Sequence, residues 1–256
     1  MELHKLYKGK VKIWFDPDKH IFYHDFRGLP DKNRSIISVT GVTRTIDKSG
    51  ALMGWVAKMM ALYLKQNWDL KKIKTELDKL QLIDYAKNHY RDAKEEAANI
   101  GIVAHDWVSA YIKGQKPDMP EDERVKSCVT AFLDFNSQLK PKWIATEKVV
   151  YSKKYDFAGR LDGVARISKI LELEDFKTSN GLYEEVIFQT AGYQIAYEEE
   201  NEVEIAQRRA IRFGKENAEF EHKIYADNKE DKQAFVDLLK FARRLKLVKK
   251  NGRNYY

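Results

Sequence analysis

The stretch that decides the fold is Gly159–Lys177, GRLDGVARISKILELEDFK. Hydrophobic and polar residues alternate along it with a period of two, which predicts two β-strands joined by a turn at Ser168–Lys169. On the second strand Asp175 and Lys177 are two residues apart, so both project from the face that also carries the leucines of this strand. Charges that continue a buried face are costly unless they are paired or bind a cation. The stretch therefore predicts a polar site where an apolar strand face ends.

A second carboxylate lies on the first of these two strands. Asp162 precedes Asp175 by 13 residues and stands between Gly159 and Gly163, which leave room for close approach of other groups. If the strands pair as a hairpin, both carboxylates reach one site. Two carboxylates around one point suit a hard divalent ion such as Mg²⁺ or Mn²⁺. An ordinary Asp–Lys ion pair is the alternative for an isolated D-x-K triplet, and the strand context favours the metal.

The chain on either side of this stretch predicts further elements. KIWF and HIFY flank DPDK, so residues 11–26 predict a hairpin, and residues 36–42 predict another short strand. Further strands are expected over 143–152, 157–167, 169–179, 207–213 and 219–226. Helical periodicity is found over 52–64, 69–98, 101–114, 125–139, 183–199 and 235–245. Helices before, within and after a short sheet, without a break in composition, predict one α/β domain.

Composition excludes several classes of protein. A hydrophobic share of 43% is too high for a disordered chain. The single cysteine, Cys128, excludes a disulfide within the chain and a multi-cysteine zinc or iron–sulfur site. The N-terminus MELHKLYKGK is polar, unlike a signal peptide, and no apolar run approaches the roughly 20 residues of a membrane span. We therefore expect an intracellular, cytoplasmic protein without a membrane partner. The net charge of +7 is compatible with a polyanionic partner but does not identify one.

Taken together, the motifs resemble the PD-(D/E)XK nuclease superfamily, and within it the RecB-type branch that includes phage-type single-domain exonucleases. GRLDG is followed by a strand that ends in DFKTS. A G-x-x-x-H helix, Gly101–His105, precedes the sheet, and a Q-x-x-x-Y helix, Gln189–Tyr193, follows it. The segment ISVTGVTRTIDKSGALMGWV also resembles phage-type members, so the resemblance spans nearly the whole chain. Leu161 stands where the family name has proline, and the iron–sulfur subtype is excluded because it needs four cysteines.

The resemblance implies a fold and a division of the chain. It implies a restriction-endonuclease-like α/β core with a central mixed β-sheet flanked by helices, preceded by an N-terminal β-hairpin and a helical segment. Residues 1–256 would form a single nuclease domain, with the hairpin and helical region over 1–100, the catalytic core over 101–246 and a basic tail over 247–256.

The resemblance also implies roles for individual residues, each with a structural alternative. The metal ligands would be His105, Asp162, Asp175, the backbone carbonyl of Phe176 and also Glu147. The residues acting in catalysis would be Asp162, Asp175, Lys177, Gln189 and Tyr193. Lys177 would position and help to deprotonate the attacking water or stabilise charge on the phosphate. The alternatives are a core histidine, a solvated glutamate at a strand start, and a helix that packs through Gln189 and Tyr193.

The activity expected from this resemblance is a Mg²⁺- or Mn²⁺-dependent DNA exonuclease that acts on single-stranded or free ends in recombination, replication or repair. Contacts to DNA are expected from Arg160, Thr178, Ser179, Arg208 and Arg212. No G-x-x-x-x-G-K-[ST] motif is present, so no nucleotide cofactor is expected. The alternatives are a structure-specific or nicking endonuclease of the same superfamily, a non-catalytic nucleic-acid-binding module, and an unrelated α/β protein with a chance D-x-K. Digestion polarity and oligomeric state are left open.

Overall fold

The computed structural model describes residues 1–69 and 71–250, with the backbone alone at residues 51 and 248–250. The chain divides into two compact units: the first comprises Met1–Thr45 and Ala104–Tyr256, and the second comprises Ile46–Val103. The single nuclease domain and its internal boundaries stay a prediction. Most of the predicted basic tail, residues 251–256, lies outside the described residues.

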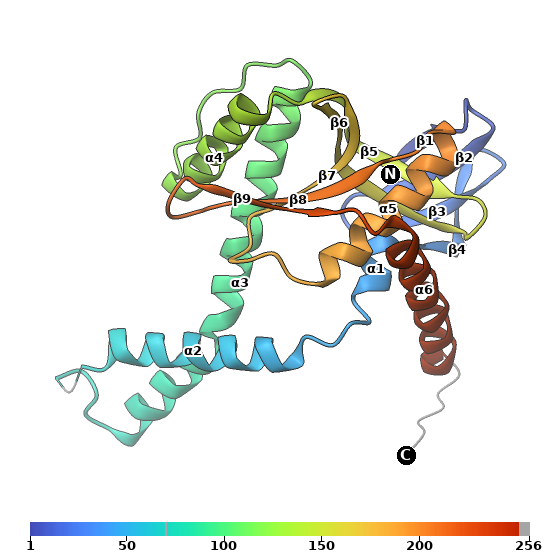
Figure 1. The fold of residues 1–256 in the computed structure, drawn as a ribbon. Coiled ribbons are helices and arrows are strands. Elements are labelled where there is room, and N and C mark those ends of the chain that lie inside the picture. Colours follow the sequence, from blue (N-terminus) through green and yellow to red (C-terminus); the bar gives the residue numbers. More distant parts are fainter. Residues whose placement is uncertain (70, 251–256) are drawn as a thin grey trace. The chain divides into compact units, whose positions relative to one another are not determined.

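The first unit is built on one mixed sheet, drawn in Figure 1. Within the described residues it has nine strands: β1 (Glu2–Leu6), β2 (Val11–Asp16), β3 (Ile21–Phe26), β4 (Leu29–Ser38), β5 (Lys142–Ser152), β6 (Phe157–Ile167), β7 (Ile170–Lys177), β8 (Gln207–Phe213) and β9 (Phe220–Tyr225). The order is β1-β2-β3-β4-β6-β7-β8-β9, and β5 also pairs with β6. The pairings β4–β6 and β7–β8 are parallel, while the others are antiparallel.

Helices occupy the connections between these strands. They are α1 (Val39–Thr43), α2 (Ser49–Asn67), α3 (Glu76–Ile112), α4 (Glu123–Leu139), α5 (Glu185–Asn201) and α6 (Asn228–Lys250). The helix α5 connects the parallel strands β7 and β8, as a crossover between parallel strands requires. None of the helices in the described part of the chain is long and apolar enough to cross a membrane.

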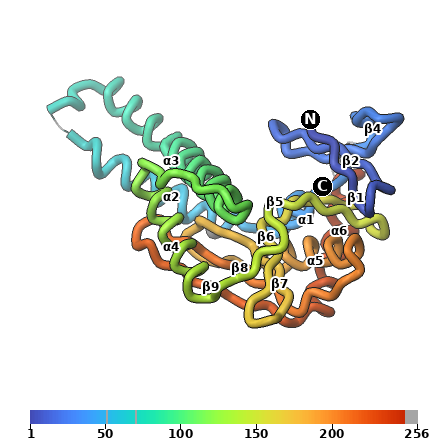
Figure 2. Tube along the Cα trace, turned by 90° about the horizontal axis from the view of Figure 1, so that it is seen from above, coloured from blue at the N-terminus to red at the C-terminus, as the bar shows by residue number. Residues whose placement is uncertain are grey.

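One layer of the core lies between the sheet and the helices α1, α5 and α6. Figure 2 shows α5 and α6 side by side. A Cβ atom at Gly192 would lie 2.6 Å from the ring of Phe235, so this glycine lets α5 pack closely against α6. The buried residues of this layer include Val39, Val42, Val150, Phe157, Leu161, Leu173, Ala196, Tyr197, Phe235 and Leu239.

Aromatic side chains fill the other face of the sheet, under α4. The ring centroid of Phe132 on α4 lies 6.2 Å from that of Phe176 on β7 and 5.7 Å from that of Phe213 on β8. Trp107 lies in the part of α3 that belongs to the first unit. Its ring centroid is 6.4 Å from that of Phe132. Because Phe176 is held here, the neighbouring Asp175 and Lys177 project from the opposite face of β7.

The second unit is a pair of helices, formed by α2 and the part of α3 up to Val103. Its inner side is aromatic: the ring centroids of Trp55 and Tyr90 are 6.4 Å apart, and those of Tyr63 and His89 are 4.9 Å apart. The apolar stripe predicted over 52–64 is only half-buried within this unit, and Leu52 at its start is 51% exposed.

Most predicted elements are confirmed, with differences at β1, at β4, at Gly101 and at the start of α3. The helix predicted over 69–98 begins at Glu76, and β4 begins at Leu29, before the predicted strand over 36–42. The α/β class, the mixed sheet flanked by helices, the hairpin over 11–26 and the strands over 142–177 are confirmed. The strand β1 was not predicted, because ELHKL lacks the apolar alternation of a half-buried strand. The predicted strand over 36–42 ends at Ser38, whose side chain accepts a hydrogen bond from the Gly41 N–H and caps α1. Gly101 does not start a helix but lies inside α3.

Candidate metal centre

The pairing of β6 with β7 brings the two motif strands together as the hairpin prediction requires. Gly163 on β6 lies opposite Glu174 on β7. The backbone N–H of Phe176 donates to Oδ2 of Asp162 at 2.7 Å. This hydrogen bond fixes the Asp162 carboxylate beside the end of β7.

Three side chains from three elements form a group that has the donors of a metal site. These are His105 on α3, Glu147 on β5 and Asp162 on β6, and one ligand atom from each lies within 4.8 Å of the others. The Nδ1 atom of His105 is 3.8 Å from Oδ1 of Asp162. One imidazole and two carboxylates fit a hard divalent ion, because carboxylate oxygens suit Mg²⁺ and Mn²⁺ and imidazole also serves as a transition-metal ligand.

The backbone of Glu147 has an unusual conformation. Its φ is +49°, in the left-handed region that a non-glycine residue in a strand rarely adopts. Glu147 lies between the pairs Thr146–Gly163 and Lys148–Leu161, which places it opposite Asp162. The Thr146 hydroxyl donates to the Asp162 carbonyl at 2.8 Å and joins the two strands at this point. Strained backbone of this kind is concentrated at functional sites, so its occurrence at Glu147 supports a role beyond packing.

The environment of Glu147 makes its carboxyl group hard to ionise. Burial and the nearby charge of Asp162 raise the pKa of Glu147 to about 7, and the guanidinium of Arg160 partly opposes this shift. The Nε atom of Arg160 lies 2.8 Å from Oε2 of Glu147. The negative charges of Glu147 and Asp162 oppose each other, and a divalent ion bound by both carboxylates would relieve this repulsion.

Asp175 is not one of these three residues, and its role as a metal ligand stays a prediction. The same holds for the backbone carbonyl of Phe176, which accepts a hydrogen bond from Nζ of Lys177 at 3.4 Å. Asp175 is fully buried and forms an ion pair with Lys177 on the same strand face. Burial, with a contribution from Asp162, raises the pKa of Asp175 to about 6, although the charge of Lys177 opposes the shift. Burial acts to lower the pKa of Lys177, but the carboxylates of Asp175 and Asp162 outweigh it and raise this pKa. Lys177 is therefore held as a cation in this geometry, and Asp175 is its counter-ion.

Gln189 and Tyr193 on α5 complete this part of the site. The side-chain Nε2 of Gln189 donates to Oδ1 of Asp175 at 3.1 Å and lies 3.3 Å from the hydroxyl of Tyr193. Tyr193 is buried, and a Cβ atom at Gly159 would lie 2.5 Å from its ring. The Q-x-x-x-Y spacing thus brings both polar groups to the face of β7 that carries Asp175.

The expected DNA contacts fall into different environments. Arg160 is exposed beside the three-residue group, with 42% of its side chain accessible. Thr178 and Ser179 follow β7 and are half-buried, and the Ser179 hydroxyl donates to the Gly181 carbonyl at 2.7 Å. Arg212 lies beside Lys177 in the β7–β8 register and is paired with Glu221 at 2.8 Å.

Arg208 is placed where it cannot make the predicted contact. Its side chain is fully buried, its Nη1 donates to the Ile187 carbonyl at 2.9 Å, and it forms an ion pair with Asp231. The strand alternation that put Arg208 and Arg212 on one face did not reveal that α5 and α6 cover the inner end of that face. We therefore assign Arg208 a structural role in place of the predicted contact with DNA.

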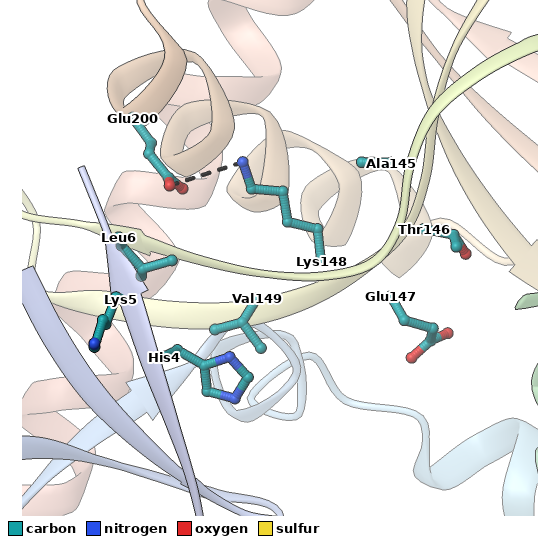
Figure 3. Close-up of a pocket in the computed structure, with 9 residues that line it drawn as sticks. All are labelled: His4, Lys5, Leu6, Ala145, Thr146, Glu147, Lys148, Val149 and Glu200. Carbon is teal, nitrogen blue, oxygen red and sulfur yellow. Dashed lines mark ion pairs between the residues drawn. The ribbon is translucent and has the colours of Figure 1, made fainter. Parts of the chain in front are cut away.

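A pocket of about 440 Å³ lies beside Glu147, between β1 and β5 (Figure 3). The side chain of Lys148 lines this pocket and forms an ion pair with Glu200, with Nζ 3.7 Å from Oε1. The same Nζ lies 5.1 Å from the centre of the Tyr197 ring. Lys148 was not among the predicted site residues. The only signal was a charged residue within an apolar strand, which is also typical of a solvated strand edge. The pocket is lined by His4, Lys5, Leu6, Ala145, Thr146, Glu147, Lys148, Val149 and Glu200.

No protein-family model matches the chain, and no curated protein matches its sequence. Among solved structures the chain is similar to an alkaline exonuclease, LHK-Exo, from Laribacter hongkongensis, at 9% identity and a TM-score of 0.35, over 85% of this chain and 95% of that chain. It is also similar to the protein SSO0001, at 13% identity and a TM-score of 0.36, over 76% of this chain and 88% of that chain.

Proposed function

We propose that this chain is a divalent-metal-dependent nuclease of the PD-(D/E)XK superfamily that hydrolyses phosphodiester bonds of DNA. One observation carries the proposal: His105, Glu147 and Asp162 converge from three elements beside the ion pair that Lys177 forms with the buried Asp175. A chance D-x-K triplet has no reason to place an imidazole and two carboxylates next to its lysine. The resemblance of the motifs in the sequence supports the same assignment.

The chain's own residues divide the chemical work. His105, Glu147 and Asp162 would hold Mg²⁺ or Mn²⁺, which when bound supplies the positive charge that polarises a phosphate and acidifies water. Lys177, kept cationic by Asp175, stabilises the negative charge that develops on the phosphate in the transition state. Gln189 fixes the orientation of the Asp175 carboxylate. The hydroxyl of Tyr193 adds a hydrogen-bonding group on the same side of the sheet.

We further propose that the enzyme is an exonuclease that prefers single-stranded or free DNA ends, with a role in recombination, replication or repair. This finer assignment rests on the resemblance to phage-type exonucleases. A structure-specific or nicking endonuclease would use the same centre, and circular single-stranded DNA separates the two because an obligate exonuclease leaves it intact. A non-catalytic binding module would bind DNA without cleaving it under any divalent ion.

The proposal is tested by digestion of linear and circular single-stranded DNA by the wild type, Lys177→Met and Asp134→Asn. Asp134 is an exposed carboxylate on α4 with no part in the centre, so its variant is the matched control. We expect the wild type and Asp134→Asn to digest linear DNA in Mg²⁺ or Mn²⁺ and to leave circles intact, while Lys177→Met is inactive. Digestion by Lys177→Met at the wild-type rate, or wild-type digestion in EDTA, would refute the proposed function.

A further inference from the structure

We infer that Arg160 changes partner when the centre is loaded: it pairs with Glu147 in the metal-free protein and binds a phosphate of the DNA strand once a divalent ion holds Glu147. This inference rests on the proposed function. It assigns Arg160 a positioning role that couples metal binding to DNA binding.

The first step is that the carboxylate of Glu147 has two possible partners, the divalent ion and Arg160. Glu147 belongs to the three-residue metal group, yet its Oε2 is also 2.8 Å from Nε of Arg160. A divalent ion at Glu147 would repel the adjacent guanidinium with twice the charge of an ordinary cation. The ion and Arg160 therefore compete for Glu147, and loading of the ion weakens the arginine's hold on it.

The second step concerns what a released Arg160 can reach. The side chain is 42% exposed, so its guanidinium can turn to solvent without unfolding its surroundings. Its guanidinium carbon lies 5.5 Å from the ring centre of Phe15 on β2, and Phe15 itself is buried and fixed in the N-terminal strands. A guanidinium that stacks on a fixed ring is held at the edge of the centre, rather than lost to bulk solvent.

The third step concerns the ligand that Arg160 would take. A planar guanidinium makes two parallel hydrogen bonds to a phosphate, a geometry that lysine cannot reproduce. The phosphate next to the scissile bond is the anion that the proposed substrate brings to this place. This change of partner makes the centre bind DNA most tightly when the ion is already present. Only then is Arg160 free of Glu147 and able to bind a phosphate.

The test uses Arg160→Gln, with Arg166→Gln as the matched control. Arg166 lies on the same strand, is exposed, and pairs in register with Leu171 away from the centre. Calorimetric titration measures Mn²⁺ binding, and fluorescence anisotropy measures binding of a labelled single-stranded oligonucleotide in EDTA and in Ca²⁺, with the DNA checked on a gel for integrity. Circular dichroism establishes that each variant is folded.

We expect Arg160→Gln to bind Mn²⁺ about 3- to 10-fold more tightly than the wild type, since the competing cation is gone. In EDTA we expect Arg160→Gln and the wild type to bind DNA with equal affinity. Addition of Ca²⁺ should then increase the DNA affinity of Arg160→Gln less than that of the wild type. Equal Mn²⁺ affinity in Arg160→Gln and Arg166→Gln, or equal loss of DNA affinity in EDTA and Ca²⁺, would overturn the exchange. Failure of the wild type to bind Mn²⁺ at all would instead overturn the proposed function.

Discussion

At the scale of single residues, the raised pKa of Glu147 predicts how the stability of the protein changes with pH. The pKa of about 7 in the folded protein exceeds the ordinary value of 4.5, so between these pH values the folded state binds more protons than the unfolded state. The free energy of unfolding of the metal-free protein should therefore fall as pH rises through this window, by at most about 3 kcal/mol from this group.

Glu147→Gln should remove that part of the pH dependence. Urea unfolding of both proteins in EDTA, from pH 4.5 to pH 8, measures the difference. Asp175 contributes a change of the same sign in both proteins and cancels in the comparison. Identical pH profiles for the two proteins would contradict the buried, unstabilised environment that we describe for Glu147.

Gly159 makes a second prediction at this scale, about packing. A methyl group at this position would lie 2.5 Å from the ring of Tyr193, which is buried and cannot swing away. Gly159→Ala should therefore cost about 1–3 kcal/mol of stability and disturb the Gln189–Tyr193 contact. Gly54→Ala, which meets nothing within 4 Å in α2, is the control and should be neutral or stabilising. Equal stability of the two variants, measured by urea unfolding, would contradict the close approach.

The sequence predicted the composition of the site better than its geometry. The hairpin and helix spacings indicated that Asp162, Asp175, Lys177 and the α5 pair would gather at one face. The spacing of residues could not show that Glu147 would lie within β5, opposite Asp162, with a left-handed backbone. Both features appear only once β5 has paired with β6.

At the scale of elements, Arg208 on β8 contacts both α5, through the Ile187 carbonyl, and α6, through Asp231. Its substitution should therefore lower the free energy of unfolding. Arg208→Gln would leave Asp231 without its buried partner, so we expect a loss of about 3 kcal/mol. Arg166→Gln, on an exposed position, should stay within about 0.5 kcal/mol of the wild type. Urea unfolding gives both values. If Arg208→Gln were as stable as the wild type but bound DNA more weakly, Arg208 would contact DNA and the structural role would be wrong.

Local sequence patterns predicted elements well where one face of the element is buried by its neighbours. The strands over 142–177 alternate because both of their faces are buried. Helix α5 covers one face, while α4 and the N-terminal strands cover the other. In contrast, β1 is a polar strand at the sheet edge, held by pairing with β2. Gly101 is a weak helix breaker that the long helix α3 tolerates. Such outcomes depend on neighbouring elements that a local window does not contain.

At the scale of the whole molecule, the charge of +7 gains a meaning from its distribution. The candidate centre is acidic, so under the proposed function the attraction to a DNA strand comes from basic residues around the centre. We expect DNA affinity to fall as salt rises, with each phosphate contact contributing about 0.7 to the slope of log affinity against log salt for a single strand. Arg212→Gln should lower that slope by about this amount, and Arg208→Gln should leave it unchanged. Equal slopes in all variants, measured by anisotropy, would contradict these placements.

The central claim, that the chain uses a metal held by His105, Glu147 and Asp162 to cleave DNA, is tested most directly by one measurement. The release of label from end-labelled linear single-stranded DNA is followed with the wild type and folded Asp162→Asn, in Mn²⁺ and in EDTA. We predict that the wild type releases label only in Mn²⁺ and that Asp162→Asn loses at least about 100-fold in rate, because it removes a donor to the ion. Release at the wild-type rate by Asp162→Asn would contradict the claim.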